Sequence, residues 1–163
     1  NLVLTSVHIL HGFIASRTPR YYSAEIYSLL EHQHIATLAP PTPYQSYYIS
    51  ACCHPHSHHL AVVDDVARFL DIYDDQHVHQ ARVNLPYRPL WENAVCTVNE
   101  YIVIADERNL RLYSWVGEKV RKQTHHDLGV ARIRGVGRSA DGRVMLAAGM
   151  QAVNSLHLYH AKC

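Results

Sequence analysis

The chain has 163 residues, of which 48% are hydrophobic and 18% are charged, and its formal net charge at pH 7 is +1. This length and composition suit a single globular domain over residues 1–163 and exclude a largely disordered chain. No run of about 18 apolar residues occurs, so the sequence predicts no membrane-spanning helix.

The predicted elements are short β-strands separated by polar turns. In chain order they are residues 7–15, 24–30, 34–38, 47–53, 59–63, 68–73, 77–83, 93–98, 101–105, 110–115, 119–123, 132–138, 144–148 and 155–160. Residues 39–43 and 85–89 are rich in proline, which cannot donate to a β-ladder, so both predict connectors between sheets. Residues 101–105 are almost continuously apolar, which predicts a strand buried on both faces.

Four of the predicted strands end in a similar tyrosine pattern. The tyrosines are Tyr27, Tyr73, Tyr113 and Tyr159, spaced by 46, 40 and 46 residues. A repeat of about 40 to 50 residues made of short strands is typical of a β-propeller blade. We therefore expect an all-β β-propeller of about four blades, each a four-stranded antiparallel sheet, over residues 1–40, 41–85, 86–127 and 128–163.

Four blades predict either a small closed ring or part of a larger ring. An incomplete ring would expose strand edges, and we would then expect a partner chain or self-association to cover them.

The four cysteines show no disulfide framework, because Cys52 and Cys53 are adjacent and Cys96 and Cys163 are isolated in sequence. The sequence therefore predicts a reducing compartment, the cytoplasm.

Fourteen histidines are present, and an unusual number of them fall in one stretch. Residues 52–59 read Cys-Cys-His-Pro-His-Ser-His-His, and both residue types can ligate zinc. The spacing matches no closed structural zinc pattern, so we interpret the stretch as a solvated hairpin turn and predict no metal and no cofactor. An imidazole titrates near pH 6.5, so the chain would become strongly cationic by about pH 5.

Positive charge gathers in residues 108–143, where nine basic residues face three acidic ones. We predict a ligand-binding patch here, formed by Arg108, Arg111, Arg132, Arg134 and Arg138. A guanidinium binds oxyanions in a bidentate way, which suits phosphate or an acidic peptide, and nearby aromatic side chains could stack on a base. The alternative is that the arginines lie outward on strand edges while Tyr113 and Trp115 belong to the blade core.

Catalysis finds little support in the sequence, and we predict no catalytic residue. The acidic pairs at residues 64–65 and 74–75 fall at turn positions, where Asp is favoured because it hydrogen-bonds its own backbone. No glycine-rich phosphate loop, nucleophile elbow or zinc-protease motif occurs.

One blade resembles the repeat unit of NHL propellers. Ile104-Ala105-Asp106, followed by Asn109 and Arg111, matches the family's apolar strand that ends in Asp and is followed by Asn and Arg. The resemblance covers residues 90–163 best. It implies a C-terminal domain of a tripartite-motif ubiquitin ligase that binds RNA or a protein target, with RING and B-box elements elsewhere supplying the ubiquitin chemistry.

Kelch propellers are the alternative family. Residues 22–27 followed by the proline-rich residues 38–43 look like a kelch third strand and its connector. The Gly-Gly pair and the Trp of kelch blades are missing at the expected positions. This resemblance implies a protein-interaction or substrate-adaptor domain. From the basic segment we expect RNA or an acidic protein or peptide as the partner, with no membrane and no small-molecule substrate.

Overall fold

The computed structural model describes residues 5–12, 21–28, 32–38, 48–54, 56–64, 66–90, 94–124, 132–138, 143–150 and 153–159. These residues form an all-β protein of fourteen strands in four antiparallel sheets. In the part of the chain that is described, no helix is long and apolar enough to cross a membrane.

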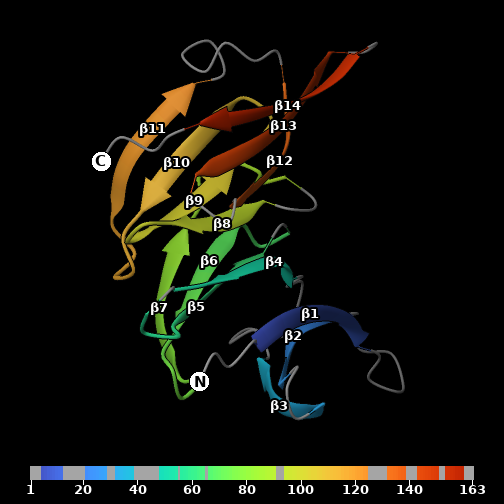
Figure 1. Cartoon of the computed structure of the whole chain (residues 1–163). Coiled ribbons are helices and arrows are strands. Elements are labelled where there is room, and N and C mark those ends of the chain that lie inside the picture. Colours follow the sequence, from blue (N-terminus) through green and yellow to red (C-terminus); the bar gives the residue numbers. More distant parts are fainter. Residues whose placement is uncertain are drawn as a thin grey trace.

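Each sheet is made of strands that follow one another in sequence (Figure 1). The first contains β1 (Thr5–Gly12), β2 (Tyr21–Ser28) and β3 (Gln33–Leu38). The second contains β4 (Tyr48–Cys53), β5 (Leu60–Asp64), β6 (Phe69–Tyr73) and β7 (His79–Asn84). The third contains β8 (Val95–Val98), β9 (Tyr101–Ala105), β10 (Asn109–Tyr113) and β11 (Lys119–Thr124). The fourth contains β12 (Ile133–Arg138), β13 (Val144–Met150) and β14 (Val153–Tyr159).

The four sheets correspond to the four predicted blades. Four strands per sheet are found in the second and third sheets, whereas the first and fourth have three strands among the described residues. The first strands of the second, third and fourth sheets lie beside one another, because β4 contacts β8 and β8 contacts β12, while β1 and β2 of the first sheet both contact β4. This is the blade arrangement of a propeller, in which first strands are innermost.

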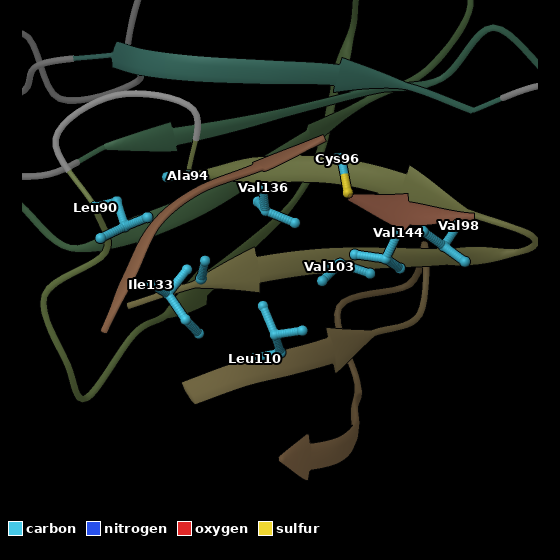
Figure 2. Close-up of a cluster of buried hydrophobic side chains, with 10 residues drawn as sticks. Leu90, Ala94, Cys96, Val98, Val103, Leu110, Ile133, Val136 and Val144 are labelled. Atoms are coloured by element: carbon cyan, nitrogen blue, oxygen red, sulfur yellow. The ribbon is translucent and has the colours of Figure 1, made fainter. Parts of the chain in front are cut away.

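Three apolar cores hold neighbouring sheets together, and the middle strands contribute to two cores each. In β5, Leu60 and Val62 face the first sheet, while Ala61 and Val63 face the third. The same alternation holds in β9, where Ile102 and Ile104 pack toward the second sheet and Val103 and Ala105 toward the fourth. Figure 2 shows the core between the third and fourth sheets. The prediction that residues 101–105 are buried on both faces is confirmed.

The tyrosine repeat marks one backbone position. Tyr27, Tyr73 and Tyr113 each lie beside a β-bulge in the pairing of the last two strands of a sheet. Tyr73 and Tyr113 are buried between sheets. Tyr159 ends β14 opposite Val144.

The turns divide the molecule into two faces. The connector face carries the β5–β6 turn (residues 64–68), the β7–β8 connector (residues 85–90), the β9–β10 turn (residues 106–109) and the start of β12. Backbone hydrogen bonds join these segments: Leu85 N–H donates to the Arg68 carbonyl, and Ile133 N–H donates to the Glu107 carbonyl. The hairpin face, at the opposite ends of the strands, carries the turns at residues 54–59, 74–78, 99–100 and 114–118.

Candidate ligand-binding site

A cavity of about 630 Å³ opens on the connector face. Its walls are the β7–β8 connector and the β9–β10 turn, through Tyr87, Arg88, Pro89, Leu90, Asp106, Glu107, Arg108 and Asn109. The two walls are joined where Leu90 N–H donates to the Ala105 carbonyl at 3.0 Å. The proline-rich connector was predicted only as a crossing between sheets, and the structure makes it one side of a cavity.

Asp106 organises the turn on the other side of the cavity. Its Oδ1 accepts hydrogen bonds from the backbone N–H groups of Arg108 at 2.7 Å and Asn109 at 2.8 Å, and from the Asn109 side-chain amide at 2.9 Å. An aspartate that bonds the backbone two and three residues ahead fixes a tight turn. The Arg108 backbone is therefore held while its side chain lies exposed at the cavity rim.

Arg111 lies beneath this turn and is 8% exposed. Its guanidinium donates to Asp106 Oδ2 at 2.6 Å, and its Cζ lies 3.5 Å from the centre of the Tyr87 ring. The Tyr87 and Tyr113 hydroxyls are hydrogen-bonded at 3.1 Å. Burial, followed by this hydrogen bond, raises the pKa of Tyr87. Asp106, Asn109 and Arg111, the residues that match the NHL pattern, thus form one network that also fixes the cavity wall.

Arg108, Arg132 and Arg134 remain accessible on this face. Arg132 pairs with Glu107 at 2.9 Å, with both side chains about half exposed. In the described part of the chain, Arg108 and Arg134 have no carboxylate partner. The predicted basic patch therefore divides into a buried structural residue, Arg111, and exposed arginines on the connector face, of which Arg108 lines the cavity.

Arg132 and Arg134 are exposed at the start of β12, and Arg138 lies at its other end. A register irregularity lies between Ile133 and Gly135 in the pairing of β12 with β13, so the alternation is broken beside Arg134. The backbone of Arg138 lies opposite Val144 at the far end of β12, and its side chain is outside the described residues.

The aromatic residues proposed for base stacking are not beside the exposed arginines. Tyr113 is 2% exposed in the core between the second and third sheets. Trp115 packs partly against that core and lies on the hairpin face, edge-on to His54 with 5.1 Å between ring centres. The alternative interpretation, in which these side chains serve the blade core, fits the structure.

Two further arginines on the connector face were not identified as candidates from the sequence. Arg88 lines the cavity, and Arg68 lies exposed in the β5–β6 turn with a φ of 57°. Arg88 stands between Pro86 and Pro89, and a charged residue in a proline-rich connector was the signal that could have found it.

The histidine-rich stretch is the β4–β5 turn, as predicted. His54 N–H donates to the His59 carbonyl at 2.8 Å and closes it. Among the residues that the structure describes, no three His, Cys, Asp or Glu side chains are arranged to hold a metal ion.

The predicted turn roles of two aspartates are confirmed. Asp64 Oδ1 accepts a hydrogen bond from Ala67 N–H at 2.7 Å. Asp74 Oδ1 accepts from Gln76 N–H at 3.0 Å and from Val78 N–H at 2.8 Å. The Val78 N–H is the main cause of a pKa of Asp74 below its ordinary value. Asp65 lies outside the described residues, and Asp75 is exposed in its turn.

No protein-family model matches the chain, and no curated protein matches it. Among solved structures, the chain is similar to Kuenenia stuttgartiensis hydrazine synthase, with a TM-score of 0.63, 14% identity, and coverage of 85% of this chain and 40% of that chain. It is also similar to BBS1N, solved in complex with ARL6DN, with a TM-score of 0.61, 10% identity, and coverage of 98% of this chain and 51% of that chain. The chain thus spans about half or less of these two structures. At such low identity the likeness concerns the fold alone, which is β-rich and propeller-like.

Proposed function

We propose that this chain is a non-catalytic recognition module that binds an acidic segment of a partner protein in the cavity of the connector face. The observation that carries the proposal is Arg108, whose exposed guanidinium stands at the rim of that cavity without a carboxylate partner in the described part of the chain.

The charge balance around the cavity supports an anionic ligand. Asp106 is paired with Arg111, and Glu107 is paired with Arg132, so neither carboxylate offers a full uncompensated charge. Arg108 in the lining then leaves a positive excess. A guanidinium at such a site can take a carboxylate in bidentate geometry.

The apolar part of the wall supports a peptide rather than a simple anion. Tyr87, Pro89 and Leu90 line the cavity together with the arginines. Peptide and ligand sites typically combine apolar and aromatic walls with a few charged groups that fix orientation. We therefore expect a segment that carries an apolar side chain next to Asp or Glu.

RNA is the second candidate ligand, because phosphates would be attracted to the same arginines. The structure supports it less, since Tyr113 is buried and Trp115 lies on the hairpin face. Single-stranded RNA binding usually relies on exposed aromatic side chains as well as positive charge.

The wider context that we propose is the target-binding domain of a tripartite-motif-type ubiquitin ligase. Its support is the match of Asp106, Asn109 and Arg111 to the NHL pattern, and a kelch-type adaptor domain is the alternative. The likeness to BBS1N, which was solved with ARL6DN bound, is compatible with a protein-binding role in either context.

The test is a binding titration with two fluorescent probes of similar charge. One is a peptide of about twelve residues that alternates Glu with Leu, and the other is a single-stranded RNA of about seven nucleotides, so that each carries about six negative charges. We expect the peptide to bind and Arg108→Glu to weaken it by at least about tenfold, the effect of losing one charge-assisted contact and adding repulsion. Arg121→Glu is the matched control, because Arg121 is exposed on β11 and does not line the cavity.

Salt distinguishes the two ligands. RNA affinity falls steeply as salt rises, because counterions are released on binding, whereas a peptide held partly by apolar contacts should lose much less. Binding of RNA without binding of the peptide would replace the proposal by nucleic-acid recognition. Loss of binding with Arg121→Glu but not with Arg108→Glu would move the site away from the cavity.

A further inference from the structure

On the hairpin face, one histidine joins the turns of two sheets. The His54 side chain is 10% exposed, and its Nε2 lies 2.8 Å from Glu100 Oε2 in the β8–β9 turn. Its ring also meets Trp115, in the β10–β11 turn, edge-on at 5.1 Å between ring centres. His54 thus connects the second sheet to two turns of the third.

The hydrogen bonds of His54 fix its tautomer. Nδ1 accepts from the backbone N–H groups of His56 at 3.2 Å and Ser57 at 3.0 Å, and a backbone N–H can only donate. Nδ1 therefore carries no proton, and the ring proton lies on Nε2, which donates to Glu100. In the closed turn, His54 is a neutral imidazole with both nitrogens in use.

We propose that protonation of His54 opens the β4–β5 turn and uncovers Trp115, so that the hairpin face responds to acidification. A proton on Nδ1 turns the acceptor of two backbone N–H groups into a donor that faces them. Both N–H groups would lose their partner, and in the described part of the turn only the backbone bond from His54 N–H to the His59 carbonyl would still hold it.

The gain at Glu100 does not offset this loss. The Glu100 side chain is 64% exposed, and an ion pair with so exposed a carboxylate adds little stability. Backbone donors left without an acceptor, and held against another donor, cost more. The closed turn is therefore less stable with a protonated His54 ring than with a neutral one.

The other charged groups around His54 do not provide a substitute acceptor. His56 and His59, in the same turn, have ring centres 6.1 and 6.3 Å from that of His54, and neither side chain offers a carboxylate. Asp74 of the β6–β7 turn is engaged by its own turn N–H groups, and Glu118 lies in the same turn as Trp115.

Trp115 makes the opening observable. Its indole N–H is buried, and within the described residues it has no hydrogen-bond partner. Opening would allow water to reach this group, which favours the open state once the His54 contacts are lost. An uncovered Trp is also a strong anchor for a protein partner.

The experiment follows amide hydrogen exchange of His56 and Ser57 between about pH 7.5 and pH 5. It also follows acrylamide quenching of Trp115 fluorescence in a Trp91→Phe background, because the chain has two tryptophans. In the unmodified chain we expect protection of the two amides to fall at least about tenfold after correction for the intrinsic pH effect, with an increase in quenching in the Trp91→Phe background and an unchanged far-UV circular dichroism spectrum. His54→Asn is the decisive variant, because an Asn Oδ1 can accept from the same backbone groups and does not titrate, as Asp74 Oδ1 does in its turn.

We expect His54→Asn to keep both amides protected at both pH values. His58→Asn is the matched control, because His58 is exposed in the same turn, with a φ of 58° that Asn tolerates, and it should leave the response intact. The proposal is overturned if amide protection does not fall with pH in the unmodified chain, or if it falls equally in His54→Asn. It is also overturned if the fall disappears in His58→Asn, or if the whole chain unfolds over the same pH range.

Discussion

The second and third sheets share strand order and bulge position, yet they bury opposite charges at the same place. Asp71 in β6 and Arg111 in β10 each lie two residues before the tyrosine that marks the repeat. Asp71 is paired with Arg82, through two hydrogen bonds of 2.7 and 2.8 Å, and with His79 at 2.9 Å. Arg111 is instead paired with Asp106, in the preceding turn. This position can therefore hold a buried side chain of either charge when a neighbouring residue supplies the opposite charge.

The source of the counter-charge decides what each sheet can do. In the second sheet both partners come from β7, and Arg82 lies over the Phe69 ring with 4.4 Å between its Cζ and the ring centre. In the third sheet the network reaches the connector face and includes Tyr87. Only there does the buried charge also shape a wall of the cavity. The two sheets thus keep the same backbone arrangement, while the residue at this position, Asp71 or Arg111, pairs with different parts of its sheet.

The largest expected effect is that of Asp106→Ala. It removes the partner of a buried guanidinium and the acceptor of two backbone N–H groups, and breaking a buried pair in this way costs about 3–5 kcal/mol. Urea unfolding of the full chain measures the change. A loss below about 1 kcal/mol would show that Arg111 does not depend on this carboxylate.

Asp71→Ala should cost less, about 1–3 kcal/mol, although Asp71 is fully buried. The Arg82 side chain is 20% exposed and that of His79 is 33% exposed, so both can reach water when their partner is removed. The comparison fails if Asp71→Ala destabilises the chain more than Asp106→Ala in the same urea experiment.

An effect of similar size is expected in the turns between the third and fourth strands of the second and third sheets. Gly117 of the third sheet and His77 of the second both have positive φ there, of 88° and 64°. A Cβ at Gly117 would lie 2.7 Å from Val83 Cγ2, so Gly117→Ala should cost about 1–3 kcal/mol. His77→Gly is the control and should change the unfolding free energy by less than about 1 kcal/mol, because glycine removes strain but adds chain entropy. Equal losses from the two substitutions would contradict the close contact with Val83.

The smallest effect concerns how the stability of the chain depends on pH in acid. Asp74 and Ser114 occupy the first position of the same two turns, and each side-chain oxygen accepts a hydrogen bond from a backbone N–H of its turn. Only Asp74 is a titratable group. Because the pKa of Asp74 lies below its ordinary value, its contribution is complete above about pH 4 and is lost as pH falls through the lowered value. Asp74→Asn keeps the acceptor, so its unfolding free energy should fall less steeply below about pH 4. Parallel pH profiles would exclude Asp74 as a contributor.

The fold could be predicted from local signals, whereas the site depended on contacts between distant residues. Tyr73 and Tyr113 identified the blades because a bulge recurs beside them, and the apolar run of β9 identified a strand with two buried faces. Arg111 was predicted as a ligand contact because its sequence neighbours do not reveal that Tyr87 covers it.

Two other parts of the site had weaker signals. The irregularity beside Arg134 was indicated only by the following Gly135, since glycine in a strand often marks a bulge. Arg88 and Arg108 come together because two turns meet at one edge of neighbouring sheets, which no local pattern specifies.

The two-sided burial of β5 and β9 has a consequence for unfolding. Each of these three cores joins two neighbouring sheets, so the described sheets approximate a linear array. The free energy of unfolding is then roughly the sum of the stability of each sheet and of its contacts with its neighbours. Between β1 and β14, the second and third sheets have two neighbours among the described strands, and the outer sheets have one. Amide protection should therefore be greatest in β5 and β9 and should decrease toward both outer sheets, so that thermal opening proceeds inward from β1–β3 and β12–β14.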